Sequence, residues 1–463
     1  MALAAAAAVR GVTAQEKPSP RWYKGNIHCH SQWSDGKDLP EVIVSEYKKN
    51  GYEFFCLSDH NIIQTDRLRF NGFAMDFTPK DLAPFEGKTS FWKRVAPAWG
   101  WPNLLEEDIK RAQERFGADS VDIIDTEEGR YVRMKTFDEL NAQFGEPGKF
   151  LMMPGFEMTA HFVHTNCVNV KKDYFVEIDD DGQTDALLKK SADTANQLYA
   201  DNGQPWLFTV NHPMWQYYNI QPSSLISRPD LIQMELLNND TSGPLCPDAW
   251  TPESFFDVVN AWRASHDQHL LMGTGTDDSH GCFRTDYLPY AAWQHVRCSE
   301  LTPGAIFDAM NRGDSYCSNG IELEDLAFDG KTLQLRAVEG EGKYRIDFIG
   351  TKKDYDPTPK PYDVAAAEGL RARQIESYSP EIGKVLESVE GREGSYTLKA
   401  DDLYVRARVY RLDENKDPVV RPESGLYNFA AWTQATPRGG RLRLSKSPSS
   451  GAKKPPFEKG GFF

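Results

Sequence analysis

Five short apolar stretches of this sequence end in side chains that can bind metal ions, and this pattern limits the fold more than any other feature. The first runs into His28-Cys29-His30 and an Asp-Gly turn at Asp35. Because side chains alternate along a strand, His28 and His30 project to one face, and the turn returns Asp35 toward it. The other four stretches carry the same residue types, namely His60, Glu157 with His164, His212, and Asp278 with His280. Barrels and open α/β sheets place their chemistry at such strand ends.

Imidazoles and carboxylates that converge on one edge suit a divalent transition metal. The ordered motifs HxHSxxSDG, SDHN, PGxE followed by His, NHP and DxH resemble those of the PHP (polymerase and histidinol phosphatase) family of metal-dependent phosphoesterases. Residues 301–320 and the β-rich part that follows are most similar to the CehA/McbA-type metallohydrolase branch. The resemblance covers residues 21–436, and a suitable residue fills each of the nine ligand positions of the family.

The resemblance implies metal positions that share ligands. They are His28, His30, Glu157 and Asp278 for one metal, Glu157, His164 and His212 for a second, and Asp35, His60 and His280 for a third. A carboxylate can bridge two cations because each oxygen can serve one metal, which suits Glu157 and Asp278. The expected cofactors are two or three divalent ions, and the ligand types do not select among zinc, manganese and iron. A bridging water would lose a proton near neutral pH and supply hydroxide for hydrolysis.

Helical patterns alternate with the apolar stretches over residues 21–320. They cover residues 39–50, 184–200 and 252–263, and a further helix opened by Thr302-Pro303 and ended by Gly313. This alternation predicts a closed or nearly closed α/β barrel. The resemblance implies, more narrowly, a distorted seven-stranded (β/α) barrel.

Residues 61–147 do not fit a simple crossover between two strands. This insertion follows His60 directly and is rich in aromatic residues: Phe70, Phe73, Phe77, Phe85, Phe91, Trp92, Trp99 and Trp101. Two interpretations stay open. The insertion is a cap whose aromatic side chains form an apolar substrate pocket beside the ligands, or it is a structural subdomain that buries its own aromatic side chains.

From residue 321 the apolar spacing changes from helical to alternating. Residues 323–328 and 332–337 flank an Asp-Gly turn at Asp329, which is the signal of a β-hairpin. Further alternating segments predict a small β-sandwich domain over residues 321–436. Residues 437–463 are rich in Gly, Ser, Pro, Lys and Arg, and we expect a disordered tail there because so few apolar groups cannot support a core.

The amino-terminal segment and the charge bear on location and partners. Residues 1–14 have an alanine-rich apolar core and end in the small residues Val12-Thr13-Ala14, so we interpret them as a signal peptide with a shortened start. A disordered alanine-rich segment is the alternative. No later apolar run reaches the ~20 residues of a membrane span, and we expect a periplasmic or secreted protein. The formal charge of −15 disfavours nucleic acid as a partner.

Several residues beside the ligands have candidate roles. Asp59 would orient a ligand histidine through its far ring nitrogen, or it would serve the turn after its strand. His161 lies three residues before His164, and we expect His164 to be the ligand because His164-Thr165-Asn166 resembles the family's His-x-Asn. Candidate substrate-binding residues are Arg284, Trp215 and Lys37, with packing or solvated surface as the alternative for each.

These features predict a metal-dependent hydrolase that acts on ester bonds of a small anionic substrate. Phosphoesters are the main candidate, because cations neutralise the charge that develops on phosphate oxygens. Carboxylic esters and carbamates are the alternative, since the same site polarises a carbonyl group. A third hypothesis is a carbohydrate- or surface-binding protein in which fully ligated metals only stabilise the barrel. The sequence assigns neither the general acid nor the oligomeric state.

Overall fold

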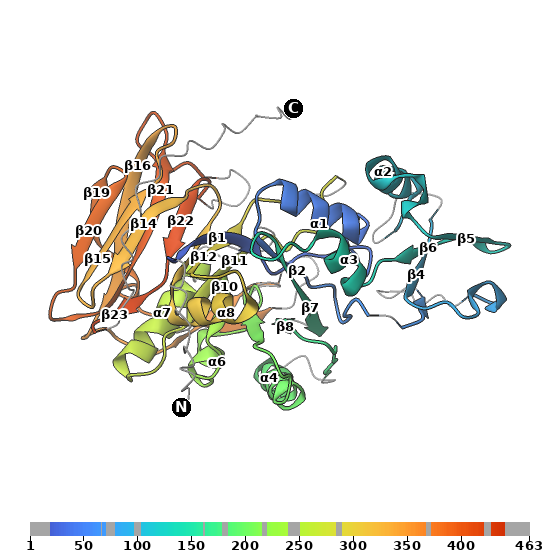
Figure 1. The fold of residues 1–463 in the computed structure, drawn as a ribbon. Coiled ribbons are helices and arrows are strands. Elements are labelled where there is room, and N and C mark those ends of the chain that lie inside the picture. Colours follow the sequence, from blue (N-terminus) through green and yellow to red (C-terminus); the bar gives the residue numbers. More distant parts are fainter. Residues whose placement is uncertain are drawn as a thin grey trace, which may run out of the picture.

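The computed structural model describes most of the chain between residues 19 and 439. The described ranges are 19–65, 67–70, 79–96, 103–160, 163–177, 184–214, 220–238, 251–283, 289–366, 372–420 and 427–439. The predicted signal peptide and nearly all of the predicted tail lie outside them. None of the helices in these ranges combines the length and the apolar character that a membrane span requires. Figure 1 shows the β-rich carboxy-terminal part at one end of the molecule, the insertion at the other, and a mixed α/β part between them.

Nine strands, all within the described residues, form a mixed sheet in the middle of the molecule. They are β1 (Arg21–Asn26), β2 (Phe54–Leu57), β7 (Leu151–Ala160), β8 (Val163–Val168), β9 (Leu207–Val210), β10 (Gln233–Asn238), β11 (Met272–Thr276), β12 (Trp293–Cys298) and β13 (Ser315–Ser318). Their hydrogen-bonded order is β11-β10-β9-β8-β7-β2-β1-β12-β13. The pairings make β1, β2, β7, β9, β10 and β11 run in one direction, so their carboxyl ends share one edge.

Helices cover this sheet. They are α1 (Pro40–Lys49), α3 (Phe137–Phe144), α4 (Thr184–Tyr199), α6 (Pro222–Ile226), α7 (Pro252–Ser265) and α8 (Pro303–Arg312). The helices predicted at 39–50, 184–200 and 252–263 are confirmed as α1, α4 and α7. The local signals also hold at α8, where Thr302 Oγ1 accepts a hydrogen bond from Ala305 N and Gly313 adopts φ +80°. The apolar face of α8 packs on β1 and β12. The apolar face of α1 packs on β2.

The predicted barrel is not confirmed, because the sheet does not close. The strand order begins at β11, and among the described residues no strand pairs with its free edge. Side chains take the place of a pairing strand: Gly273 N donates to Gln434 Oε1 (2.7 Å), and Gln434 Nε2 donates back to Gly273 O (2.8 Å). Gly275 N donates to Gln294 Oε1 (2.8 Å). A Cβ at Gly275 would lie 2.6 Å from Trp293 O, so β12 approaches β11 closely without forming a strand ladder.

The β-rich part has two facing layers. The main sheet continues from β13 into β22 (Ala430–Thr433), β21 (Asp402–Leu412), β16 (Lys343–Lys352) and β19 (Lys384–Glu390), with β23 (Thr436–Pro437) beside β21. A three-stranded sheet of β14 (Leu323–Phe328), β15 (Thr332–Ala337) and β20 (Glu393–Thr397) lies against it, and β17 (Lys360–Val364) pairs with β18 (Arg373–Ser377). Both layers supply the same apolar core. The predicted hairpin is confirmed as β14 and β15, whereas the β-sandwich domain with a boundary at 321 stays a prediction.

A buried network of ion pairs joins α7 to β21. Arg406 binds Asp257 through two hydrogen bonds, Nε to Oδ1 (2.8 Å) and Nη2 to Oδ2 (2.6 Å). Arg406 Nη1 also lies 2.8 Å from Glu253 Oε2, and Arg408 Nη1 donates to Glu253 Oε1 (2.9 Å). Burial raises the pKa of Glu253, but Arg408 and Arg406 outweigh burial and hold it at about 2. The carboxylate form of Glu253 therefore stabilises the contact between the two parts.

Replacing Glu253 by Gln should make the free energy of unfolding less dependent on pH. The folded pKa lies below the ordinary value of 4.5, so the contribution of Glu253 is present above pH 4.5 and is lost as the pH falls toward 2. The variant should be less stable at pH 7 by at most ~3 kcal/mol, and the difference should shrink in acid. Urea unfolding at several pH values measures this, with exposed Glu127→Gln as control. A difference that does not change with pH would contradict the account.

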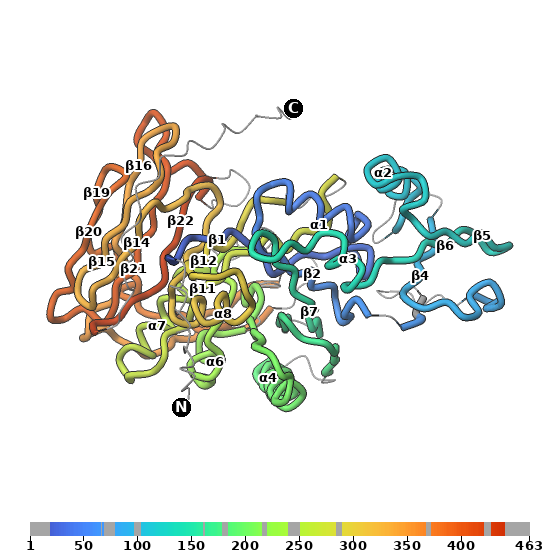
Figure 2. Tube along the Cα trace, in the orientation of Figure 1, coloured from blue at the N-terminus to red at the C-terminus, as the bar shows by residue number. Residues whose placement is uncertain are grey.

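The insertion folds around aromatic side chains of its own. Its elements are β3 (Arg69–Phe70), η1 (Ala83–Phe85), β4 (Phe91–Arg94), α2 (Glu106–Phe116), η2 (Ala118–Ser120), β5 (Ile123–Thr126) and β6 (Gly129–Met134), and Figure 2 shows this part projecting beyond α1 and α3. Phe85, Trp92 and Tyr131 form one small buried cluster, and Phe91 lies in another. Phe85 and Trp92 are thus buried within the insertion, whereas Phe91 also packs against Trp33 outside it, and the choice between the two interpretations stays open. Phe73, Phe77, Trp99 and Trp101 lie outside the described residues.

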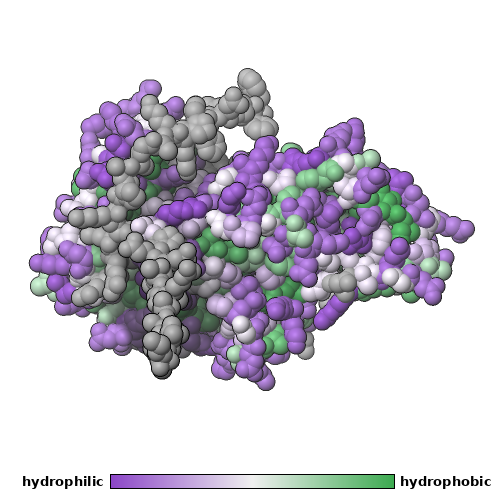
Figure 3. Space-filling view, viewed as in Figure 1, coloured by the Kyte–Doolittle hydropathy of each residue, from purple (hydrophilic) through white to green (hydrophobic). Residues whose placement is uncertain are grey.

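The hydrophilic surface of the molecule is consistent with the high formal charge of the chain. Hydrophilic residues dominate the face drawn in Figure 3, and apolar residues appear there only as small separate areas. A surface of this kind is expected for a chain with a formal charge of −15.

Candidate metal centre

The carboxyl ends of the parallel strands carry a buried cluster of histidines and carboxylates. The cluster contains, in chain order, His28 and His30 after β1, Asp35 in the following turn, His60 after β2, Glu157 in β7, His164 in β8, His212 after β9, and Asp278 and His280 after β11. None of these residues is more than 8% exposed. All nine predicted ligands are therefore brought to one place, although they come from across the sequence.

The backbone is constrained at two points of this cluster. A Cβ at Gly36 would lie 2.5 Å from the carbonyl carbon of His30, so the turn that presents Asp35 requires glycine. Asp278 adopts φ +51°, a left-handed conformation that is strained for an aspartate. Strain of this kind is typical of functional sites, where the surrounding structure holds the residue in place.

The ligand atoms form four overlapping groups in which every atom lies within 4.8 Å of the others. The groups are His30, Asp35, His60 and His280; His28, His30 and Glu157; His28, His212 and Asp278; and Glu157, His164 and His212. Each group has enough nitrogen and oxygen atoms to hold a metal ion. The overlap arises because Glu157, His28, His30 and His212 each belong to two groups.

Glu157 lies at the centre of the cluster. Its Oε1 is 3.2 Å from His28 Nε2, 3.3 Å from His164 Nδ1 and 3.4 Å from His212 Nε2. Its Oε2 is 2.7 Å from His60 Nδ1. The two oxygens thus face different sets of imidazoles, which is the arrangement a bridging carboxylate needs.

The other two carboxylates each join a pair of histidines. Asp278 Oδ1 lies 2.9 Å from His30 Nε2 and 3.1 Å from His28 Nε2. Asp35 Oδ2 lies 3.4 Å from the Nε2 atoms of both His60 and His280. With Glu157, they distribute three negative charges over the whole cluster.

The donor set fits divalent cations. His28 Nδ1 lies 2.6 Å from Glu235 Oε1, and His280 Nδ1 lies 2.9 Å from the carbonyl oxygen of Asp278. These outer contacts take the Nδ1 protons, so the Nε2 lone pairs of both rings face the cluster. Burial and the neighbouring His60 and His280 lower the pKa of His30 to about 3, which keeps this imidazole neutral.

The central carboxylate is ionised. Burial alone would raise the pKa of Glu157, but the imidazoles of His28, His164 and His60 outweigh burial and hold it well below its ordinary value. Burial lowers the pKa of His28, His60, His212 and His280, but the neighbouring carboxylates outweigh burial and raise it. Metals coordinate neutral imidazole and ionised carboxylate, so a metal ion that binds these histidines would displace their protons.

Among the described residues, Asp59 makes no hydrogen bond or ion pair with a ligand histidine. Its carboxylate accepts hydrogen bonds from Ser31 N (2.7 Å), Ser34 Oγ (2.8 Å) and Gln64 Nε2 (2.8 Å). The bonds from Ser31 and Ser34 hold the loop between His30 and Asp35 instead of the turn after β2, which is a role that neither prediction named. The sequence could not separate the two roles, since both place an aspartate directly before His60.

Glu235 is a residue of the site that sequence reasoning missed. It lies in β10, is 2% exposed, and contacts His28 through its side chain. The sequence did offer a signal for Glu235. It is an acidic residue inside the apolar run 231–236, and its strand lies between the strands that lead to His212 and Asp278. A buried carboxylate there requires partners, and the nearest candidates are the ligands.

The predicted substrate-binding residues have different outcomes. Lys37 is 7% exposed, and its backbone N donates to the carbonyl oxygen of His280 (2.7 Å), which places it beside a ligand. Arg284 and Trp215 lie outside the described residues, as does His161, the alternative to His164. Substrate contact for all three predicted residues stays a prediction.

The insertion braces the loop that carries Asp35. Lys93 of β4 is 4% exposed and donates from Nζ to Ser34 O (2.7 Å) and Gln32 O (3.3 Å). Trp33 stacks on Phe91 at 5.3 Å between ring centroids, and its Nε1 donates to Lys135 O (2.8 Å). The described part of the insertion therefore reaches the cluster by supporting its loop.

Replacing Lys93 by Met should loosen that loop and weaken metal binding by the Asp35, His60 and His280 group. We expect about a 10- to 100-fold loss of affinity there, the range typical of residues that support metal ligands. Calorimetric metal titration measures the loss, with Lys88→Met, an exposed lysine of the same insertion, as control. Unchanged titrations of both variants would show that Lys93 does not support the site.

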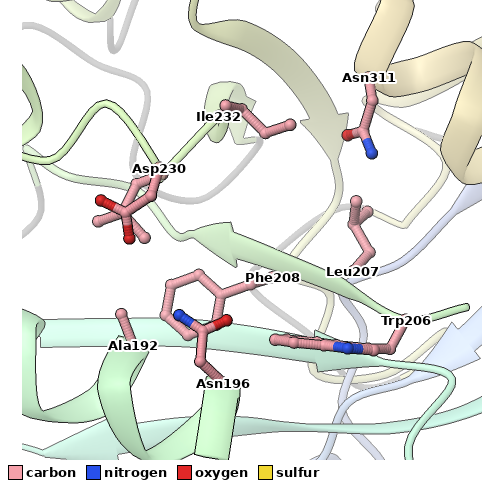
Figure 4. Close-up of a pocket in the computed structure, with 9 residues that line it drawn as sticks. Ala192, Asn196, Trp206, Leu207, Phe208, Asp230, Ile232 and Asn311 are labelled. Carbon is pink, nitrogen blue, oxygen red and sulfur yellow. The ribbon is translucent and has the colours of Figure 1, made fainter. Parts of the chain in front are cut away.

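A surface pocket lies at the opposite ends of the same strands. It is lined by Trp206, Leu207 and Phe208 at the start of β9, by Ile232 before β10 and by Asn311 of α8 (Figure 4). None of the nine clustered residues lines it. The pocket and the metal centre are therefore separate features of the fold.

Comparisons with known proteins give distant likenesses. No protein-family model matches the sequence, and no curated protein matches it either. One similar solved structure is a two-domain protein from Bacteroides vulgatus that contains a PHP-like metal-dependent phosphoesterase by prediction; it is 13% identical, with a TM-score of 0.36, over 92% of this chain and 100% of that one.

A second similar structure is a protein from Bifidobacterium adolescentis whose description as a metal-dependent phosphoesterase is itself a prediction. It is 14% identical, with a TM-score of 0.27, over 58% of this chain and 92% of that one. Both TM-scores lie below 0.5, so neither likeness carries the assignment. Membership of the PHP family and of its CehA/McbA branch stays a prediction.

Proposed function

We propose that this chain is a metal-dependent hydrolase with a multinuclear site that cleaves phosphoesters of small molecules. The observation that carries the proposal is the convergence of nine buried histidine and carboxylate side chains in four overlapping groups. Buried carboxylates and imidazoles at this density are costly unless they are paired with cations. Shared ligands also favour chemistry over a purely structural role, because structural sites keep separate, closed ligand sets.

The chain's own residues prepare the site. His28, His60, His164 and His212 surround Glu157, so its charge is shared among them. Bound divalent cations would lower the pKa of water at the site and neutralise charge on substrate oxygens. We propose Zn²⁺, Mn²⁺ or Fe²⁺, in two or three positions, because imidazole and carboxylate accept each of them.

Phosphoesters are preferred over carbonyl substrates for an electrostatic reason. Phosphoryl transfer spreads charge over several equatorial oxygens, and adjacent cations stabilise all of them. Carboxylic esters and carbamates would gain from the polarisation of one oxygen only. Bound metal ions would give the site a positive charge, which would attract a small anionic substrate. Nucleic acid is disfavoured, because the formal charge of the whole chain is −15.

Hydrolysis assays on protein reconstituted separately with zinc, manganese and iron test this function. The substrates are an aryl phosphate, an aryl phosphodiester and an aryl carboxylate ester, and Asp278→Asn is the matched control. A preference for phosphate that disappears in the variant supports the proposal. A preference for the carboxylate ester identifies a carbonyl hydrolase instead. Metal binding without any hydrolysis favours the binding-protein hypothesis and overturns the proposal.

The location belongs to the same proposal. Residues 1–14 have the composition of an export signal, which favours a periplasmic or secreted protein. Fusion of these residues to a reporter that folds only after export would test this directly.

A further inference from the structure

Glu235 makes four short contacts from the middle of the sheet. Oε1 lies 2.6 Å from His28 Nδ1 and accepts a hydrogen bond from Thr276 Oγ1 (2.7 Å). Oε2 accepts hydrogen bonds from His212 N (2.8 Å) and Asn238 Nδ2 (2.9 Å). Both oxygens are thus fully used, and no side chain of similar length but different chemistry can accept four donors in this way.

These contacts converge on one group of ligands. The bond to His28 fixes its ring with Nε2 toward the cluster, and the bond to His212 N fixes the backbone of that histidine. Asn238 connects Glu235 to the third ligand, since its Nδ2 also lies 3.1 Å from Asp278 Oδ2. His28, His212 and Asp278 are one of the four groups that could hold a metal ion.

We propose that Glu235 is the positioning residue for the metal position formed by His28, His212 and Asp278. It holds these three ligands in their coordinating orientation and makes the His28 imidazole a stronger donor, as carboxylates behind ligand histidines do. This inference rests on the proposed metal-dependent function. Glu235 has no hydrogen bond or ion pair with Asp35, His60 or His280 among the described residues, so its effect is confined to one side of the cluster.

The test is metal titration of Glu235→Gln after the metals have been removed from the purified protein. Gln keeps the shape but cannot accept from all four donors. Calorimetry with Mn²⁺ should show weakening by about 10- to 100-fold at the positions that use His28 or His212, strongest where both take part, while the group of His30, Asp35, His60 and His280 keeps its affinity. Substitution with Co²⁺ should alter the visible absorption of the ions that these two histidines hold and leave that of the last group unchanged. Glu41→Gln, a buried carboxylate on α1 that binds Lys135 outside the cluster, is the matched control and should change neither readout.

Two results would overturn the inference: unchanged affinity at every step, or equal weakening of all steps. If Glu235→Gln does not fold, Thr276→Val provides the test, because it removes one donor and leaves the carboxylate in place. The same positions should weaken, by less than about 10-fold, and a variant without a weakened position contradicts the inference. The proposed function fails separately, namely if the unaltered protein binds metal but hydrolyses no ester, or binds no metal.

Discussion

Glu157→Gln should lower kcat/KM for the preferred ester by on the order of 10³-fold, the largest effect expected of any single substitution. The carboxylate faces His28, His164 and His212 with one oxygen and His60 with the other. An amide supplies only one acceptor and no charge, so it can neither bridge two cations nor balance them. Steady-state kinetics on the reconstituted protein measures the loss.

The loss at Glu157 must be separated from unfolding. Asn211 Nδ2 donates a hydrogen bond to Glu157 Oε1 (2.7 Å). Gln has the same shape as Glu, so its amide oxygen can accept this bond in the variant. Circular dichroism should therefore show a folded variant. Glu127→Gln, an exposed carboxylate in the insertion, should keep full activity. If Glu157→Gln retains more than about a tenth of the activity, the central carboxylate does not have the role assigned to it.

Removal of the metals should lower the stability of the protein markedly. Without cations, Asp35, Glu157 and Asp278 are buried together with Glu235 and are balanced only by imidazoles. Ions that bind the folded state alone stabilise it by about 4 kcal/mol each at a free concentration 1,000 times Kd. Thermal unfolding with excess Mn²⁺ and with chelator should give clearly different Tm values.

The control for the stability measurement compares Tm with Mn²⁺ and with chelator in Asp278→Asn. This variant lacks the carboxylate that lies against His28 and His30. The metal-dependent shift of Tm should be smaller in this variant than in the unaltered protein. Equal Tm values with metal and with chelator, in the unaltered protein, would show that the cluster does not bind the ions tested.

The sequence was informative where the signal is local or periodic. Helix α8 has its cap at Thr302, proline at its first position and glycine after its last residue, all within one short stretch. The hairpin of β14 and β15 follows from alternation around Asp329. The ligands could be predicted because their motifs resemble those of the PHP family, and because most of them lie where parallel strands bring their carboxyl ends to one edge.

Features that depend on distant residues could not be predicted. The free edge of β11 is occupied by Gln434, which is far from β11 in the sequence and binds both backbone groups of Gly273. The role of Asp59 depended on where Ser31 and Gln64 would lie. Glu235 was missed because it lies inside a strand, and only the fold shows that its oxygens meet His28 and His212.

Anomalous diffraction from crystals grown with Mn²⁺ or Zn²⁺ would show whether the nine clustered residues hold metal ions. We expect two or three strong anomalous peaks inside the cluster, about 3.5–4 Å apart, with Glu157 contacting at least two of the ions. Crystals without anomalous density among the nine clustered residues, or with metal bound only at the protein surface, would contradict the account.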